Sequence, residues 1–270
     1  MCGIVAVTGY KKALPLLING LEKLENRGYD SAGIAIINSE TNSITCNKAE
    51  GKLKNLKSNL IDKNITGTVG IGHTRWATHG KPEVKNAHPH IDGSGTIAVV
   101  QNGIIENFQD LKNKLQKEGV VFNSDTDTEV IPHLIQRELN TLSKLNLDKN
   151  GSTLLVAVRN VISDLEGSYA LAVLWADAPT ALVVARRQAP LIIGLGEGEF
   201  ICASDTPAIA NFTNIILPME DDEIALLTPL GIEIYDSNNE RQYRNPVSLT
   251  VSEQIMYCLL YTSPSPRDDR

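Results

Sequence analysis

The residue with the clearest chemical potential is a cysteine at the second position of the chain. Cys2 becomes N-terminal if Met1 is removed, which a small second residue permits. Its thiol, with an ordinary pKa of about 8.5, then lies beside an α-amine that titrates at roughly 7.7–8.0. The amine can take the thiol proton and later protonate a leaving group, so one residue supplies nucleophile and base. Taken alone, Met1-Cys2 is more typical of an ordinary buried cysteine.

Polar, aromatic and basic residues follow an apolar run in Gly72-His73-Thr74-Arg75-Trp76-Ala77-Thr78-His79-Gly80. Such a cluster at a strand end is typical of a ligand pocket. Arg75 can hold a carboxylate through two parallel hydrogen bonds, which a lysine does less well. Four histidines in this region also suggest a metal site, namely His73, His79, His88 and His90. Without nearby cysteines or a matching carboxylate pattern, we expect no metal there.

Two further segments admit both a structural and a chemical interpretation. Asn102-Gly103 follows an apolar run and is first of all a type I′ turn signal. The alternative is an oxyanion hole, in which the Asn102 side-chain amide and the Gly103 backbone N–H donate to a tetrahedral intermediate. Thr126 and Glu129 fit a capping box at the start of a helix. Asp127, between them, can face a pocket and receive a substrate ammonium.

The segment Asn26-Arg27-Gly28-Tyr29-Asp30-Ser31-Ala32-Gly33 is equally open. Its structural interpretation is a helix stop, with Gly28 at the C-cap and Arg27 near the negative end of the helix dipole. Asp30 and Ser31 are then turn residues. The sequence of this segment alone favours neither structure nor function.

Short strands and groups of helices must position these residues. Apolar residues at helical spacing predict helices near residues 14–24, 53–60, 105–115, 130–135 and 154–165. Apolar runs predict strands at residues 4–8, 34–37, 43–46, 68–72, 96–101, 169–175, 181–185, 191–193, 200–203, 223–227 and 232–235. Runs of strands broken by groups of helices favour an α+β layered domain.

Composition excludes several classes of protein. The 270 residues are 42% hydrophobic and 21% charged, which is ordinary for a globular protein of one large domain or two small ones. A net charge of -7 argues against nucleic-acid binding. No apolar run is long enough for a membrane span, and the start lacks the basic residues of a secretory signal. We therefore expect a cytoplasmic protein with reduced cysteines.

Together these segments resemble the class-II, N-terminal-nucleophile glutamine amidotransferases. Five strings occur in the family's order: Met1-Cys2-Gly3-Ile4-Val5, Arg27-Gly28-Tyr29-Asp30-Ser31-Ala32-Gly33, His73-Thr74-Arg75-Trp76-Ala77-Thr78-His79-Gly80, Asn86-Ala87-His88-Pro89-His90 and Asn102-Gly103-Ile104-Ile105-Glu106-Asn107. The resemblance implies an α+β fold, the four-layer αββα sandwich of N-terminal-nucleophile hydrolases, with two mostly antiparallel sheets. It also implies hydrolysis of L-glutamine to glutamate and ammonia, with no metal or organic cofactor.

The resemblance implies a catalytic role for three residues and a supporting role for a fourth. Cys2 would attack the side-chain amide of glutamine and form an acyl-enzyme. Asn102 and Gly103 would hold the oxyanion, and the Gly103 backbone would also help to receive the substrate ammonium. Arg27 would support the N-terminal residue.

The substrate-binding residues also follow from the resemblance. Arg75 would bind the α-carboxylate of glutamine, helped by Trp76, Thr78 and His79. Asp127 would receive the α-ammonium.

The extent of the resemblance sets the expected domain limits. It covers residues 1–247, the predicted glutaminase domain, and residues 248–257 would begin a linker. Residues 258–270 are more typical of translated cloning sequence, so we expect them to be non-native and disordered. Sugar-isomerase domains would follow the linker in a homo-oligomeric parent protein. There the released ammonia would aminate fructose 6-phosphate to glucosamine 6-phosphate.

The sequence departs from the family pattern at Gln101, and two alternative functions stay open. Gln101 stands where the nearest relatives usually have histidine, which would alter the surroundings of the cysteine or the communication between domains. Phosphoribosyl-pyrophosphate amidotransferases are similar but usually differ at Tyr29 and at residues 76–79. A glutamine-binding module without turnover is the non-enzymatic alternative.

Overall fold

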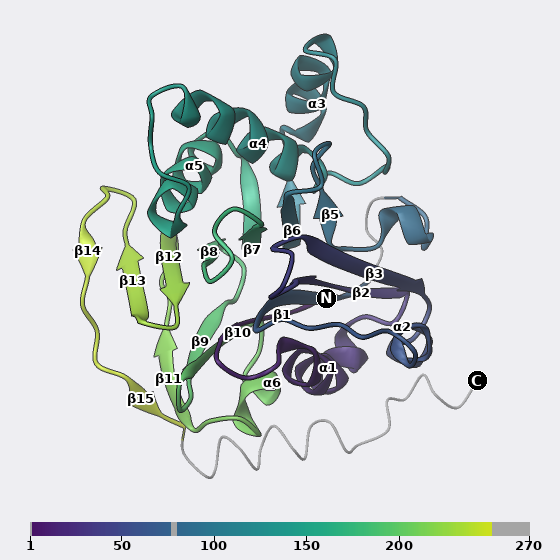
Figure 1. Ribbon diagram of the computed structural model, residues 1–270, viewed down its shortest axis with the longest axis vertical. Helices are drawn as coiled ribbons and strands as arrows, with labels where there is room; N and C mark the ends of the chain where they lie inside the picture. The colour runs from purple at the N-terminus through teal and green to yellow at the C-terminus, as the bar shows by residue number, and fades with distance from the viewer. Residues whose placement is uncertain (1, 77–79, 250–270) are drawn as a thin grey trace.

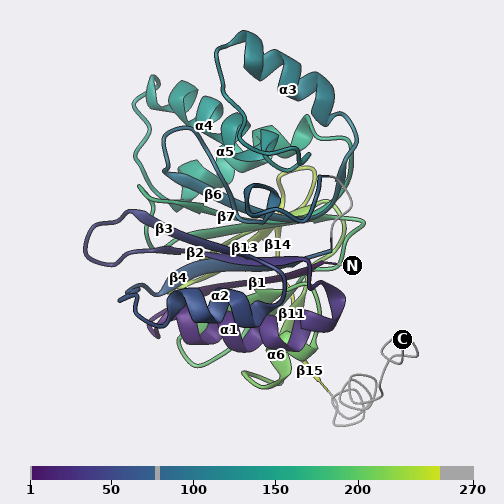
Figure 2. The same ribbon diagram turned by 90° about the vertical axis from the view of Figure 1, so that its right-hand side faces the viewer.

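Two facing β-sheets lie between two layers of helices in the computed structural model, which describes residues 2–76 and 80–249 (Figure 1 and Figure 2). Every pairing between its named strands is antiparallel. The predicted α+β sandwich is therefore confirmed. Within the described ranges, the helices are too short or too polar to cross a membrane.

The first sheet has eight strands, with both ends of the described chain in it. Their order across the sheet is β15 (Val247–Ser248), β11 (Ile215–Pro218), β9 (Ile192–Leu195), β10 (Glu199–Ala203), β1 (Gly3–Gly9), β4 (Val69–Arg75), β2 (Ser31–Ile37) and β3 (Ile44–Glu50). Strand β1, which follows Cys2, is central and pairs with β10 and β4.

The second sheet has seven strands from the middle and later part of the chain. Their order is β14 (Arg241–Gln242), β13 (Gly231–Tyr235), β12 (Glu223–Thr228), β8 (Leu182–Arg187), β7 (Gly167–Trp175), β6 (Ile97–Ile105) and β5 (His90–Ile91). Strand β6 carries Asn102 and Gly103 and lies against β1 and β4 of the first sheet.

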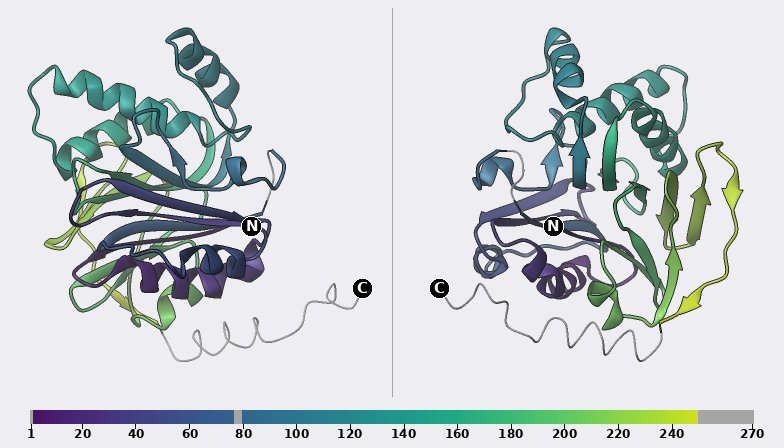
Figure 3. Two further views of the ribbon diagram at one scale, coloured as in Figure 1. Left: turned by 45° about the vertical axis from the view of Figure 1, so that its right-hand side comes forward. Right: turned by 180° about the vertical axis from the view of Figure 1, so that it is seen from behind.

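Each sheet has helices on its outer face (Figure 3). The eight-stranded sheet is covered by α1 (Ala13–Leu24), α2 (Leu53–Leu60) and α6 (Pro207–Ala210). The seven-stranded sheet is covered by α3 (Phe108–Lys117), α4 (Val130–Ser143) and α5 (Gly151–Ser163). Two single turns of 3-10 helix, η1 (Glu25–Arg27) and η2 (Val84–Asn86), connect strands and helices.

The alternation of strand side chains decides which residues enter the layer between the sheets. On β1, Ile4 and Ala6 face the other sheet, whereas Val5 and Val7 face α1. On β4, Val69 and Ile71 share one face and also lie between the sheets. Burial of each large aliphatic side chain stabilises the fold by about 1.5–3 kcal/mol.

The same alternation brings the site residues together. On β4, the next two alternate positions after Ile71 are His73 and Arg75, which therefore also lie between the sheets. The alternate position before Ile4 is Cys2, which lies on the same side of β1. On β6 the inter-sheet positions are even-numbered, so Asn102 enters the same layer. Four polar residues therefore meet at one end of an apolar layer.

Two structural interpretations that the sequence left open do not occur in the structure. Asn102-Gly103 forms no turn, because β6 continues to Ile105 and Gly103 pairs with Tyr169 of β7. The Thr126–Glu129 capping box is also absent. The Glu129 carboxylate instead accepts hydrogen bonds from the backbone N–H groups of Asn123 (2.8 Å) and Ser124 (2.6 Å), and α4 begins at Val130.

The lengths of some elements also differ from the sequence predictions. The helix expected from residue 105 begins at Phe108, and short elements such as β5, α6 and β11 were not predicted. Strand β15 lies across the predicted domain limit at residue 247 and pairs with β11. That limit stays a prediction.

Candidate active site

Cys2 lies directly before β1, at the end of the inter-sheet layer. Pairing of Gly3 with Thr74 brings it beside the end of β4. The Trp76 backbone N–H donates to the Cys2 Sγ at 3.2 Å, and the Trp76 carbonyl oxygen is 3.5 Å from the same sulfur. The Cys2 thiol thus lies where a backbone N–H group can stabilise its thiolate form.

Opposing effects act on the pKa of the Cys2 thiol. Burial raises it, whereas the hydrogen bond from Trp76 and the positive charge of Arg75 lower it, and the net direction is upward. A thiol with a raised pKa needs a base to remove its proton at neutral pH. Met1, whose removal would provide the α-amine as that base, lies outside the described residues.

Asn102 and Gly103 lie next to Cys2 at the end of β6. The Asn102 side-chain Nδ2 donates to the Cys2 carbonyl oxygen at 3.1 Å. Gly103 has a φ of +109°, and a Cβ there would lie 2.1 Å from the Ser168 carbonyl oxygen. Glycine is therefore required by backbone conformation and by the close approach of β7.

Arg75 and Asp127 supply opposite charges. Arg75 is only 4% exposed, and its guanidinium donates to the carbonyl oxygens of Gly80 and Lys81, both at 3.3 Å. The Asp127 carboxylate accepts from the Ile105 backbone N–H at 2.8 Å. Burial lowers the pKa of Arg75, and nearby negative charges, that of Asp127 included, partly offset this effect. The guanidinium stays charged at physiological pH.

A cavity of about 20 Å³ joins these groups. It is lined by Cys2, Arg75, Trp76, His88, Gln101, Gly103, Thr126, Asp127 and Thr128. Asn102, on β6, borders the site through its bond to Cys2. The structure thus brings together six of the nine predicted site residues. Thr78 and His79, also predicted to bind substrate, lie outside the described residues.

Arg27, the ninth predicted residue, does not line the cavity. It lies on η1 and forms an ion pair with Asp205, which the sequence analysis did not select. The preceding Ser204 accepts a hydrogen bond from the Ile4 backbone N–H at 3.0 Å. Arg27 therefore contacts the segment that holds the start of β1.

Gly28, after Arg27, has a contact requirement rather than a special backbone angle. A Cβ there would lie 2.6 Å from the Arg75 carbonyl carbon and 2.9 Å from the Trp76 nitrogen. The helix-stop interpretation accounts for only part of the role of Gly28, since the absence of a side chain also lets η1 approach Arg75 and Trp76 at the end of β4.

Three of the four noted histidines form a buried aromatic cluster beside Asn102. The rings of His73 and His88 stack at 4.2 Å with an interplanar angle of 13°, and His90 meets the edge of His88 at 4.7 Å. Among the described residues, no group of three or more His, Cys, Asp or Glu side chains is arranged to hold a metal ion. His73 Nε2 instead lies 3.0 Å from the Asn102 Oδ1, a contact that the sequence analysis missed.

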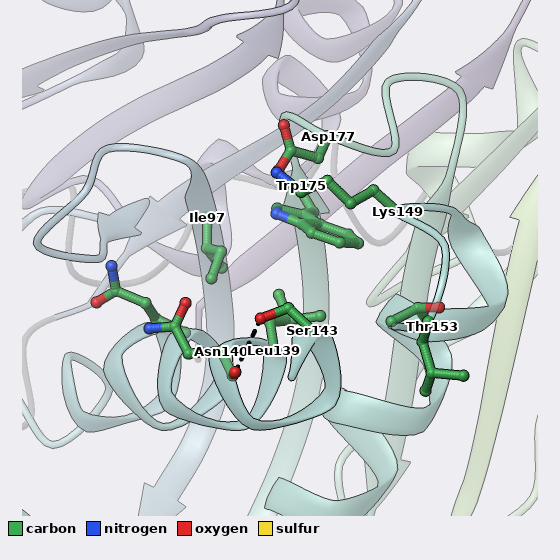
Figure 4. Close-up of a pocket in the computed structure, with 10 residues that line it drawn as sticks. Ile97, Leu139, Asn140, Ser143, Lys149, Thr153, Trp175 and Asp177 are labelled. Carbon is green, nitrogen blue, oxygen red and sulfur yellow. Dashed lines mark hydrogen bonds and ion pairs between the residues drawn. The ribbon is translucent and has the colours of Figure 1, made fainter. Parts of the chain in front are cut away.

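A larger hollow of about 120 Å³ lies elsewhere, between α4, α5 and the start of β6 (Figure 4). Its lining includes Trp175 and the ion pair between Lys149 and Asp177, whose atoms are 2.7 Å apart. None of the nine predicted site residues lines it. The smaller cavity is lined by the thiol of Cys2 and the charged groups of Arg75 and Asp127, so chemistry rather than size identifies the candidate site.

Comparison with known proteins agrees with this geometry. A protein family described as a glutamine amidotransferase domain matches residues 73–211, just over half of the chain. The chain is 53% identical over 249 residues to glutamine–fructose-6-phosphate aminotransferase (isomerizing) of Thermosynechococcus vestitus, covering 92% of this chain and 38% of that protein. It is 51% identical over 238 residues to the enzyme of that name from Methanosarcina acetivorans, covering 87% and 38%. The chain thus spans well under half the length of these relatives.

Solved structures show the same architecture. Glutamine phosphoribosylpyrophosphate amidotransferase from B. subtilis is similar with a TM-score of 0.72 and 27% identity, over 90% of this chain and 50% of that one. A glutamine aminotransferase class-II domain protein from Silicibacter pomeroyi has a TM-score of 0.54 at 12% identity, over 87% of this chain and 99% of that one. The latter likeness concerns the fold alone. The chain belongs to the glutamine amidotransferase domain family.

Proposed function

We propose that this chain hydrolyses the side-chain amide of L-glutamine to glutamate and ammonia, with Cys2 as the nucleophile. The observation that carries this proposal is one cavity lined by a thiol, a guanidinium, a carboxylate and the backbone of Gly103. The donor group of Asn102 lies beside it, 3.1 Å from the Cys2 carbonyl oxygen. A thiol nucleophile and oxyanion donors are the groups that amide hydrolysis through an acyl-enzyme requires.

The charges of the cavity match an α-amino acid. Arg75 pairs with the α-carboxylate and Asp127 with the α-ammonium, so the substrate backbone is held at both charged groups. Because Asp127 is fixed to β6 by its bond from Ile105, its carboxylate needs little reordering on binding. Trp76, Thr78 and His79 complete the proposed binding site.

The reaction begins once removal of Met1 has exposed the α-amine of Cys2. The amine takes the thiol proton, and the sulfur attacks the side-chain carbonyl carbon of glutamine. The Asn102 Nδ2 and the Gly103 backbone N–H donate to the resulting oxyanion. Return of the proton to the amide nitrogen releases ammonia and leaves a thioester. Water, deprotonated by the same amine, then attacks the thioester and releases glutamate.

The wider function of the whole protein is also a proposal. The 53% identity to an enzyme named for fructose 6-phosphate supports amination of that sugar by the released ammonia. The 27% identity to a phosphoribosylpyrophosphate amidotransferase supports the alternative acceptor less well. Sugar-isomerase domains, a homo-oligomeric parent and a cytoplasmic location belong to the same proposal.

Replacement of the nucleophile tests the glutaminase proposal. Cys2→Ala should lower the rate of glutamate and ammonia release by at least about 1,000-fold, with an unchanged thermal unfolding midpoint. Cys46→Ala, which removes another partly buried thiol outside the cavity, should keep wild-type activity. Intact mass must establish in each sample that Met1 is absent.

The same assay separates the competing functions. Undiminished ammonia release by Cys2→Ala would refute the role of Cys2. Binding of labelled glutamine by the processed wild type without glutamate formation would favour the module that binds but does not turn over.

A further inference from the structure

The Asn102 amide must face one particular way to serve an oxyanion. Its nitrogen donates hydrogen bonds, whereas its oxygen would repel a developing negative charge. The two orientations have almost the same shape, because the amide oxygen and nitrogen are similar in size. The terminal torsion of asparagine is also broad and roughly two-fold. Packing alone therefore selects weakly between them, and a hydrogen-bond partner must decide.

We infer that His73 is the positioning residue of this site: its ring Nε2–H holds the Asn102 side-chain oxygen and thereby turns the amide nitrogen toward the Cys2 reaction centre. This inference rests on the glutaminase function proposed above. It assigns a role to a residue that does not line the cavity.

Hydrogen-bond chemistry fixes each atom in this arrangement. His73 Nε2 lies 3.2 Å from the Gln101 carbonyl oxygen, which can only accept, so this ring nitrogen carries the hydrogen. It also lies 3.0 Å from the Asn102 side chain, whose facing atom must then be the acceptor Oδ1. At the other end, Asn102 Nδ2 lies 3.1 Å from the Cys2 carbonyl oxygen, which again can only accept. Both ends of the network demand the same orientation.

The donor hydrogens of Asn102 then divide between two tasks. An amide nitrogen carries two hydrogens. One is directed to the Cys2 carbonyl oxygen and ties β6 to the start of β1. The second is the one that we assign to the oxyanion. A rotated Asn102 amide would put its oxygen in that place and remove the donor.

His73 is held firmly enough to impose this choice. The residue is 1% exposed, lies on β4 between β1 and β2, and stacks on His88. His88 Nδ1 accepts a hydrogen bond from the Gln101 backbone N–H at 3.2 Å, which ties the second ring to β6 as well. Burial lowers the pKa of His73 to about 3, so the ring is neutral at physiological pH and carries a single hydrogen, which the contact with the Gln101 carbonyl oxygen assigns to Nε2.

Replacement of His73 by residues with and without a donor tests the inference. His73→Phe keeps a ring but loses the donor, and we expect kcat for glutamine hydrolysis to fall roughly 100-fold with little change in KM. His73→Gln, which retains an N–H at the end of its side chain, should recover most of this loss. His73→Met, of similar length but without a donor, should not, and this pair serves if the phenylalanine variant does not fold.

Two further measurements distinguish loss of the Asn102 orientation from a general distortion of the site. In an Asn102→Ala background, His73→Phe should lower kcat by less than about twofold, because the group it orients is already absent. The rate at which iodoacetamide alkylates Cys2, followed by mass spectrometry of its peptide, should stay at the wild-type value. That displacement forms no oxyanion, whereas a distorted site would change the surroundings of the thiol.

Binding of glutamate γ-semialdehyde tests His73 without turnover. The thiol proton passes to the α-amine of Cys2, the sulfur forms a bond to the aldehyde carbon, and the carbonyl π pair becomes the oxyanion of the resulting hemithioacetal. His73→Phe should weaken this adduct about as much as it lowers kcat.

The outcomes identify which claim has failed. Equal adduct affinity in wild type and His73→Phe, or full additivity with Asn102→Ala, would overturn the inference. Absence of glutamine hydrolysis by the processed wild type would instead count against the proposed function.

Discussion

The layer between the two sheets has two parts with opposite chemistry, and each contains a cysteine. Cys202 of β10 is completely buried among aliphatic side chains such as Ile193 and Leu227, and burial raises the pKa of its thiol. Burial also raises the pKa of Cys2, which lies directly before the neighbouring strand β1, but there Trp76 donates to the sulfur and Arg75 supplies positive charge. The same type of side chain is a core group in one part and the proposed nucleophile in the other.

This comparison indicates how the fold supports chemistry. Strands β1, β4 and β6 run through both parts, so the aliphatic layer fixes the strand ends on which the polar groups stand. The polar end then needs no flexible segment to align its donors. Substitutions at the polar end should therefore change activity, and substitutions in the aliphatic part should change stability.

After replacement of Cys2 itself, the largest effect is expected for Asn102, the proposed oxyanion donor. Asn102→Ala should lower kcat for glutamine hydrolysis by about 100- to 1,000-fold while KM stays close to the wild-type value. Steady-state kinetics measure the first effect and thermal unfolding checks that the fold is retained. A loss seen mainly in KM would assign Asn102 to substrate binding and break the comparison.

A smaller loss is expected from the ammonium site. Asp127→Asn keeps the acceptor for the Ile105 N–H but loses the negative charge, so kcat/KM should fall roughly 10- to 100-fold. Asp125→Asn is the matched control, because that carboxylate is 58% exposed and pairs with Lys85 at the surface. If both variants lose the same activity, the cavity charge is not what recognises the substrate.

Much of the fold is predictable from the sequence for a simple physical reason. Strands such as β1 and β7 are continuous apolar runs because both of their faces are buried. The long helices α1, α4 and α5 have clear helical spacing of apolar residues. Elements such as β5, α6 and β15 are too short to carry a period, and tertiary pairing alone creates them.

The candidate site was predictable where short strings of residues occur in a recognisable order. Cys2 alone is more typical of a buried cysteine, and it was selected with Arg75 because the strings that contain these two residues occur in the family's order. Asp127 followed from the same resemblance. Asn102-Gly103 was ambiguous, because a turn signal and an oxyanion donor use the same two residues, and only the pairing with β7 excludes the turn.

His73 and Asp205 were missed for another reason. Each acts through a partner distant in sequence, namely Asn102 and Arg27. A single sequence contains no signal for such pairs. The position of Ser204-Asp205 directly after the apolar run 200–203 is a weak signal for Asp205 itself, but it does not indicate Arg27 as the partner.

The buried histidines at the polar end of the layer should make the folded protein less stable in acid. Burial lowers the pKa values of His73, His88 and His90 well below 6.5. Below about pH 6.5 the unfolded chain therefore binds protons that the folded chain does not, and the unfolding free energy falls as pH falls. Each neutral imidazole contributes up to about 1.4 kcal/mol per pH unit to this slope.

Replacement of one of these imidazoles tests the argument. Between about pH 7 and about pH 5.5, His90→Phe should lose less stability than the wild type, by about 1 kcal/mol. Urea denaturation at both pH values measures the difference. Identical pH dependence in the two proteins would mean that His90 titrates alike when folded and unfolded.

The smallest effect is expected in the aliphatic part of the layer. Ile193 is completely buried on β9, where it pairs with Cys202 and Leu217. Ile193→Val removes one methylene group and should lower the unfolding free energy by about 1 kcal/mol, with kcat and KM unchanged. Ile61→Val makes the same change at a residue that is 77% exposed and should alter stability by less than about 0.5 kcal/mol. A fall in kcat with Ile193→Val would show that the aliphatic layer reaches into the chemistry, because the strand ends would then depend on its packing in detail.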